Sequence, residues 1–187
     1  MAWKKVEFKL AQADRALEGL LSTKSREEFY DRLTLFLSAA RSAVSVLAFQ
    51  YGLREFEKGE KAAGTNRHLV LSAAERQKRQ SFDAWLEHAA APVLTHPLKA
   101  DRDSDVHREG TSSARFRLPP GAGLLLEPGG PMETPLVSRH GGFGLPLEGP
   151  RPEDFYFQFD TARPAVAVCR DYLALIRSLV ATARAHV

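Results

Sequence analysis

Three side chains that could act together on a phosphate lie close together near the middle of the chain: Arg102, Asp103 and His107. In a helix, Asp103 and His107 are neighbours one turn apart, and Arg102 lies about 100° round the axis from Asp103. A carboxylate beside an imidazole fixes its tautomer and raises its basicity, whereas a guanidinium holds a phosphate in its planar fork. The spacing therefore suggests chemistry on a phosphate.

The same segment also fits a solvated helix face, because charges of both signs cluster there. Asp101 and Asp105 flank Arg102, so the arginine has carboxylates at hand for a surface ion pair. His107, near the end of a short helix, is then an exposed or capping histidine. The negative charge beside Arg102 also opposes phosphate binding, and both interpretations stay open.

The sequence lacks the residue patterns that several other kinds of catalytic or metal site require. The chain has six histidines, but none forms an H-E-x-x-H pattern or a comparable ligand pair, and one cysteine cannot build a multi-cysteine zinc site. The sequence contains no G-x-S-x-G elbow and no P-loop. We therefore expect no metal and no cofactor. Cys169 lies in an apolar periodic run and is expected to be a small core residue.

Length and charge set the class of protein. With 187 residues, the chain is long enough for one domain whose core needs no disulfide or metal. The net charge of +3 and the pI of about 9.1 permit a polyanionic partner without requiring one. The first residues lack the apolar region of a signal peptide, and we identify no apolar run long enough to span a bilayer. These features predict a cytoplasmic protein with no membrane segment.

The elements that must position the arginine motif are mostly helices. Apolar periodicity predicts a first helix over residues 6–22. The pattern of Ser25 and Glu28 is a capping box, in which the serine accepts from the first-turn amides and the glutamate reaches back to the cap. It opens a long helix over 26–57, and the glycine-containing stretch 58–66 is expected to be a loop.

The segment just before the motif is also expected to be helical. A second capping-box pattern at 72–75 opens a long helix that runs toward residue 91. Pro92 then marks a bend or a stop. The dipeptide at 96–97 can restart a helix, with proline in its favoured first turn, and Gly110 can cap its end. The motif therefore falls in a short helix with both ends near solvent.

Glycine and proline become frequent between about 111 and 160, where we do not expect a helix. Segments 114–118 and 123–127 flank a Pro-Pro-Gly sequence and are predicted to pair as a small hairpin. The aromatic segment 155–159 is a further candidate strand.

A strong amphipathic helix closes the chain. Asp160 or Thr161 is expected to cap it, and its apolar positions recur through Val180. We expect it to pack on the long helix 26–57. The predicted fold class is mainly α: one domain over 1–187, a four- to five-helix bundle with a small β-hairpin in a Gly/Pro-rich insertion at about 111–160.

An arginine, a polar residue, a few intervening positions and a histidine, near the start of a short helix in a helical bundle, resemble the signature of the HEPN superfamily. The matching residues are Arg102, Asp103 and His107. Two long helices before the motif, a Gly/Pro-rich excursion after it and a final helix containing Val168–Leu173 are similar to the family's layout. The lead-in Leu94–Lys99 resembles that of bacterial members, so the resemblance spans most of the chain.

Active members of this superfamily are metal-independent ribonucleases, often toxins or phage-defence effectors, that typically act as dimers with the two motifs facing across a cleft. The resemblance implies that His107 acts as general base or acid when the RNA 2′-hydroxyl attacks the adjacent phosphodiester. It also implies that Arg102 stabilises charge on the phosphoryl oxygens and that Asp103 orients His107. Four basic residues would contact the RNA backbone without regard to sequence: Lys99, Arg108, Arg115 and Arg117. The expected partners are RNA, a second copy of the chain, and an antitoxin or other partner protein.

The alternative is a non-catalytic helical binding or partner module of a defence or toxin system. Members of the superfamily often carry asparagine where this chain has Asp103, and many members have lost activity. The presence of both Arg102 and His107 favours the enzyme. The acidic neighbours and the modest net charge favour the binding module.

Overall fold

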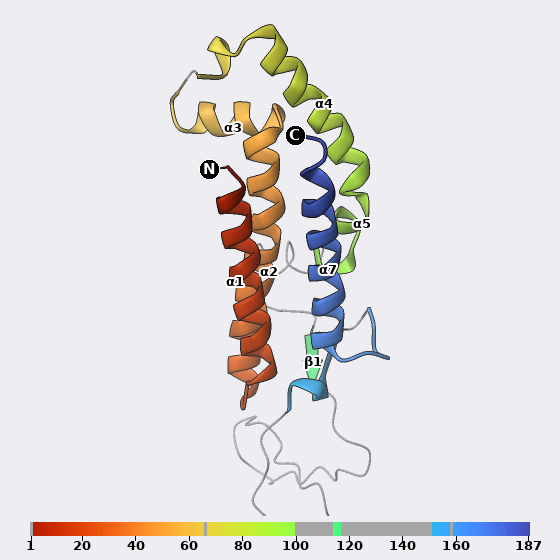
Figure 1. Ribbon diagram of the computed structural model, residues 1–187. Coiled ribbons are helices and arrows are strands. Elements are labelled where there is room, and N and C mark those ends of the chain that lie inside the picture. Colours follow the sequence, from red (N-terminus) through yellow and green to blue (C-terminus); the bar gives the residue numbers. More distant parts are fainter. Residues whose placement is uncertain (1, 66, 100–113, 117–150, 158) are drawn as a thin grey trace, which may run out of the picture.

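A computed structural model shows a bundle of helices with a two-stranded sheet near one end (Figure 1). It describes residues 2–65, 67–99, 114–116, 151–157 and 159–187, and the structural statements below concern these residues. The elements in chain order are α1 (Ala2–Leu21), α2 (Arg26–Tyr51), α3 (Arg54–Ala62), the 3₁₀ helix η1 (Arg67–Val70), α4 (Ala73–Ala89), α5 (Ala91–Leu94), β1 (Ala114–Phe116), the 3₁₀ helix η2 (Pro152–Asp154), β2 (Phe155–Phe157) and α7 (Ala165–Ala183).

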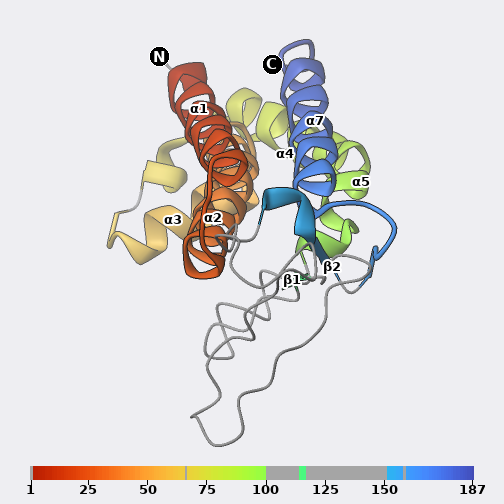
Figure 2. The same ribbon diagram turned by 90° about the horizontal axis from the view of Figure 1, so that it is seen from below.

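The long helices alternate in direction around a shared core. Helices α1 and α2 lie side by side and antiparallel, and α7 packs against both (Figures 1 and 2). Helix α4 contacts α2, and α5 packs on α7, which closes the other side of the bundle. Helix α3 crosses the end of the bundle near which the chain begins and ends (Figure 1). The predicted mainly α fold, a helical bundle, is confirmed.

Apolar stripes explain why the helices pack in this way. Helix α2 buries one face, as a helix against a core must. The residues of that face are Phe29, Leu33, Phe36, Leu37, Ala40, Ala43 and Leu47. At the sheet end, the ring of Phe29 stacks on Phe155 with 3.8 Å between ring centroids. Cys169 on α7 is fully buried in this core, as predicted.

The predicted long helix 26–57 is wrong at its end, because α2 stops at Tyr51. Gly52 leaves the helical conformation, and the Asp83 carboxylate on α4 accepts hydrogen bonds from the amides of Leu53 and Arg54 at 2.9 and 3.0 Å. A Cβ on Gly52 would lie 2.3 Å from Asp83 Oδ1, so only glycine permits this approach. The chain therefore turns here and starts α3.

The predicted loop 58–66 is also wrong in its first half, because α3 continues to Ala62. Gly59, one of the two glycines behind the loop prediction, lies inside the helix. A Cβ there would come within 2.3 Å of the Phe49 ring, so the glycine permits close packing of α3 on α2. Gly64 has a positive φ of 66°, the conformation that glycine favours after a helix end.

Both capping-box signals lie at helix starts, as predicted. Ser25 accepts a hydrogen bond from the Glu28 amide at 3.1 Å, although Glu28 reaches back to the amide of Lys24 rather than to that of Ser25. The box of Ser72 and Glu75 is complete in both directions. Helix α4 ends at Ala89, before Pro92, and residues 97–99 are helical again, as expected.

Strand β1 pairs in antiparallel register with β2, so that Arg115 lies opposite Tyr156. The predicted strand 155–159 is confirmed over Phe155–Phe157. The hairpin partner predicted for β1, 123–127, lies outside the described residues; the strand that the structure records beside β1 comes about 40 residues later in the chain.

The start of the last helix differs from the prediction. Helix α7 begins at Ala165 with Pro164 at its N-cap, so neither Asp160 nor Thr161 caps it. Asp160 instead binds Arg163. The predicted packing of this helix on α2 is confirmed, with α1 as an additional neighbour.

Among the described residues, one helical stretch, Glu27–Tyr51 in α2, is long and apolar enough to cross a membrane by length and composition alone. The core helix of a soluble protein meets the same criterion. In the bundle, the apolar face of α2 packs on α1 and α7. The expectation of no membrane segment stays a prediction.

Candidate functional site

The residues predicted to do chemistry fall mostly outside the described part of the chain. This holds for the catalytic candidates Arg102, Asp103 and His107 and for the RNA-binding candidates Arg108 and Arg117. Lys99 is the last described residue before the motif; its side chain is half-buried and its amide donates to the His96 carbonyl at 2.9 Å. Arg115 lies in β1. The structure thus describes residues before and after the motif segment in the chain, but not the motif itself.

The described elements on either side of that segment in the sequence pack on or beside α7. Helix α5, the strand β2 and the 3₁₀ helix η2 all contact α7, and β1 pairs with β2 (Figure 2). Leu98, four residues before Arg102, is fully buried and belongs to the core. The chain is therefore anchored immediately before the motif, and it is anchored again at β1.

A group of polar residues surrounds this anchor point, and we name it the His96 cluster: His96, Asp160, Arg163, Asp171 and Tyr172. The His96 ring lies against the Tyr172 ring with 4.7 Å between centroids. Its Nδ1 accepts a hydrogen bond from the Leu98 amide at 3.3 Å. Because Nδ1 is the acceptor, the ring is held in the neutral form that carries its proton on Nε2.

Arg163 connects the two carboxylates of the cluster. Its Nε donates to Asp160 at 2.7 Å and its Nη1 donates to Asp171 at 2.6 Å. The hydrogen bond from Arg163 holds the pKa of Asp160 below its usual value, and Asp160 and Asp171 raise the pKa of the guanidinium. Arg163 is therefore fixed in place by a carboxylate on either side.

The electrostatic surroundings also act on His96. Partial burial lowers the pKa of the imidazole, and the nearby positive charge of Arg163 lowers it further, while Asp171 acts in the opposite direction. Two carboxylates against one guanidinium leave the cluster with a negative charge when His96 is neutral. A site of this charge repels a phosphate, so the cluster is suited to holding the chain in position and not to binding an anion.

Sequence reasoning missed most of this cluster. The sequence predicts Asp160 only as a possible cap of the last helix and His96 only as the residue before a helix-starting proline, and it gives Arg163 no role. Asp171 and Tyr172 belong to the segment Val168–Leu173 that supports the family resemblance. The turn before Pro164 brings Arg163 to Asp171, and no local spacing rule signals that contact.

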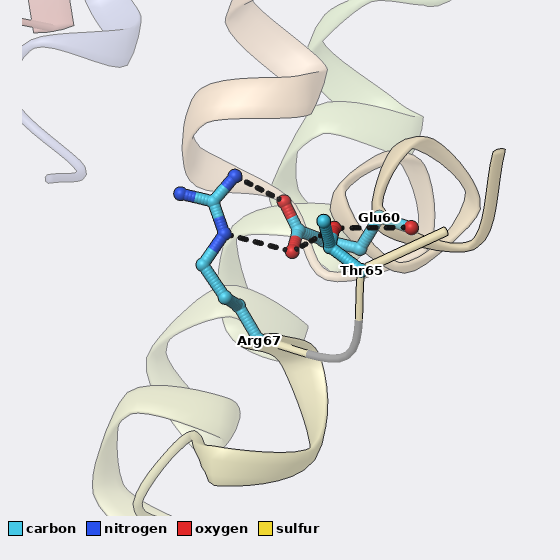
Figure 3. Close-up of polar contacts among 3 residues, drawn as sticks. All are labelled: Glu60, Thr65 and Arg67. Carbon is cyan, nitrogen blue, oxygen red and sulfur yellow. Dashed lines mark hydrogen bonds and ion pairs between the residues drawn. The ribbon is translucent and has the colours of Figure 1, made fainter. Parts of the chain in front are cut away.

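A second polar group lies at the opposite end of the bundle, where α3 leads into η1 (Figure 3). The side chain of Glu60 is only 2% exposed and accepts from Thr65 Oγ1 at 2.7 Å and from Arg67 at 2.9 and 3.0 Å. The hydrogen bonds from Thr65 and Arg67 lower the pKa of this carboxyl. The group ties the end of α3 to η1, and we assign it a structural role.

No cluster of three or more His, Cys, Asp or Glu side chains that could hold a metal occurs among the described residues. Comparison with protein-family models, with curated proteins and with solved structures found no match to this chain.

Proposed function

We propose that the protein is a metal-independent endoribonuclease of the HEPN type, with Arg102 and His107 at its catalytic centre. The observation that carries the proposal is the spacing of arginine, polar residue and histidine at 102–107 in a chain that folds as a helical bundle. The anchoring of the chain by Leu98 directly before this motif gives further support, because a catalytic group needs a rigid base.

In this mechanism the nucleophile belongs to the substrate. His107 takes the proton of an RNA 2′-hydroxyl, the 2′-oxygen attacks the adjacent phosphorus, and the bond from phosphorus to the 5′-oxygen breaks. The protonated His107 then gives this proton to the leaving 5′-oxygen, so the imidazole returns to its neutral form. Arg102 stabilises the negative charge that develops on the phosphoryl oxygens, and Asp103 orients the imidazole. The products are a 2′,3′-cyclic phosphate and a 5′-hydroxyl.

The remaining parts of the proposal follow from the family type. Lys99, Arg108, Arg115 and Arg117 would contact the RNA backbone. The protein would be a cytoplasmic toxin or phage-defence effector, and two copies would form the cleft in which the motifs face each other. Light scattering of the purified protein tests the dimer directly, since a monomer at micromolar concentration contradicts the shared cleft.

The second candidate is a non-catalytic partner module. It is favoured by the acidic residues around Arg102, namely Asp101, Asp103 and Asp105, and by the net negative charge of the His96 cluster near the same segment. Both features weaken the attraction of a phosphate backbone. A module of this kind would bind a partner protein and leave RNA intact.

The two candidates are separated by incubating RNA with the wild type and with Arg102→Ala and His107→Ala, each with and without EDTA. His88→Ala is the matched control, because it removes an exposed histidine on α4 that does not belong to the arginine motif. The ribonuclease proposal expects cleavage by the wild type and His88→Ala in EDTA and its loss in the other two variants. Intact RNA in all samples, or cleavage by His107→Ala equal to that of the wild type, contradicts it.

A further inference from the structure

We propose that His96 is a pH-sensitive latch: its neutral ring holds the turn Pro97–Lys99 against α7, and protonation of the ring releases that turn. His96 would act as a positioning residue for the chain that enters the motif. The latch itself rests only on described residues, whereas its effect on RNA cleavage rests on the proposed function.

The hydrogen bond of His96 to its own turn is possible only for a neutral ring. Nδ1 accepts from the Leu98 amide at 3.3 Å, and the Lys99 amide donates to the His96 carbonyl at 2.9 Å, so the two contacts close the turn. A protonated imidazole has N–H donors at both nitrogens and accepts nothing. Protonation therefore places two donors face to face and leaves the Leu98 amide without its partner.

Because His96 and Leu98 both contact the core, a change in this turn also affects the residues packed against it. The ring lies on Tyr172, which is 3% exposed, and Leu98 is fully buried. A ring that moves to reach water must leave Tyr172, and the turn that carries Leu98 into the core loses one of its supports. Lys99, where the described chain ends before the motif, belongs to the same turn.

The charged groups around the ring come from two elements. Arg163, in the segment before α7, opposes a positive charge on His96, and Asp171 on α7 favours it. Asp171 is already bound to Arg163 at 2.6 Å, so it is not free to pair with His96 alone. The third neighbouring element, α5, has the sequence Ala-Pro-Val-Leu and carries no titratable side chain.

Burial and Arg163 together keep the pKa of His96 below its usual value, with Asp171 offsetting part of this effect. The neutral ring therefore predominates at pH 7, and the ring gains its proton at a lower pH than an ordinary histidine does. The unfolded chain therefore binds that proton at a higher pH than the folded chain does. The stabilising contribution of neutral His96 is complete above the ordinary histidine pKa of about 6.5, and it is lost as the pH falls through the lower folded pKa.

His96→Asn is the informative variant. An asparagine side chain accepts from the amide two residues later, as in an Asx turn, so it replaces Nδ1 without a group that titrates. His96→Ala removes both the acceptor and the ring. Amide and imidazole NMR spectra of the full chain are recorded from pH 8 to 5, and the imidazole signal missing from His96→Asn identifies His96.

We expect the His96 ring to titrate with a midpoint below about 6.5 and the Leu98 amide to shift with the same midpoint. In His96→Asn the Leu98 amide stays constant, and urea unfolding loses less stability between pH 7 and pH 5 than in the wild type. A His96 midpoint at or above the ordinary value overturns the latch, as does a Leu98 amide that stays constant while His96 titrates. If neither variant folds, sequential assignment of the wild-type spectra identifies the His96 and Leu98 signals, and the wild-type titration alone decides the matter.

The outcome for the latch is separate from that for the ribonuclease. A titrating Leu98 amide in a protein that leaves RNA intact supports the latch and contradicts the proposed function. Cleavage of RNA by a protein whose Leu98 amide does not respond supports the function and contradicts the latch.

Discussion

Asp83 on α4 stabilises a helix that lies about 30 residues earlier in the chain, because its carboxylate caps the start of α3. It accepts hydrogen bonds from the amides of Leu53 and Arg54 at 2.9 and 3.0 Å. These amides belong to the first turn of α3, where donors have no partner within the helix. The substitution Asp83→Ala leaves both donors without this acceptor at the junction of α2, α3 and α4.

The expected cost follows from two comparable quantities. Removal of an N-cap costs about 0.5–2 kcal/mol, and a hydrogen bond to a charged group contributes about 1.5–3 kcal/mol. The hydrogen bond from the buried Leu53 is partly buried, whereas that from Arg54 is exposed, so we expect Asp83→Ala to lower the free energy of unfolding by about 2 kcal/mol. At a typical slope of about 2 kcal/mol per molar urea, the unfolding midpoint moves down by about 1 M.

Glu87→Ala is the matched control, because it removes the same charge one turn further along α4. Glu87 pairs with Arg54 at 3.4 Å, and both side chains are exposed by more than 60%. An exposed pair of this kind contributes about 0–1 kcal/mol. Urea unfolding followed by far-ultraviolet circular dichroism measures both variants. A loss in Asp83→Ala no larger than that in Glu87→Ala would refute the capping argument.

Two further predictions concern the bundle core and the Glu60 group. Phe29→Ala removes a fully buried ring that stacks on Phe155 at 3.8 Å, and it should lower the free energy of unfolding in urea by about 3–5 kcal/mol. Phe8→Ala, at an exposed position, is the control and should change that free energy by less than about 0.5 kcal/mol. Equal losses in the two variants would contradict a core built around Phe29. Because the folded pKa of Glu60 is lowered, its stabilising effect is complete above the ordinary glutamate value of about 4.3 and is lost as the pH falls through the lower folded value. The Glu60→Gln variant should therefore be less stable than the wild type at pH 7 and lose less stability on acidification to pH 3. If the variant and the wild type have the same urea midpoint as each other at pH 7 and again at pH 3, this prediction is wrong.

Local signals in the sequence predicted the helix starts, and contacts between distant residues explain the errors. The capping boxes at Ser25 and Ser72 involve residues only three positions apart, so the pattern and the structure agree. The end of α2 depends on Asp83, about 30 residues away, and apolar periodicity alone continues past it. Gly59 resembles a loop residue until the ring of Phe49 is placed beside it.

The candidate site could be predicted only as a local motif. Arg102, Asp103 and His107 stand out by type and spacing, and the described residues end before them. The structure adds the support that precedes the motif, in which His96 rests on Tyr172 of α7. That contact joins residues 76 positions apart in the sequence, so no local pattern reveals it.

In the proposed reaction, RNA is cleaved by its own 2′-hydroxyl with Arg102 and His107 as the catalytic groups. The most direct test uses one RNA oligonucleotide and its 2′-deoxy counterpart, both incubated with the wild type in EDTA. We expect that the wild type cuts only the RNA, that the products carry 2′,3′-cyclic phosphate and 5′-hydroxyl ends, and that Arg102→Ala and His107→Ala leave the RNA intact. Cleavage of the deoxy strand, products with 5′-phosphate ends, or an RNA left uncut by the wild type would contradict this mechanism.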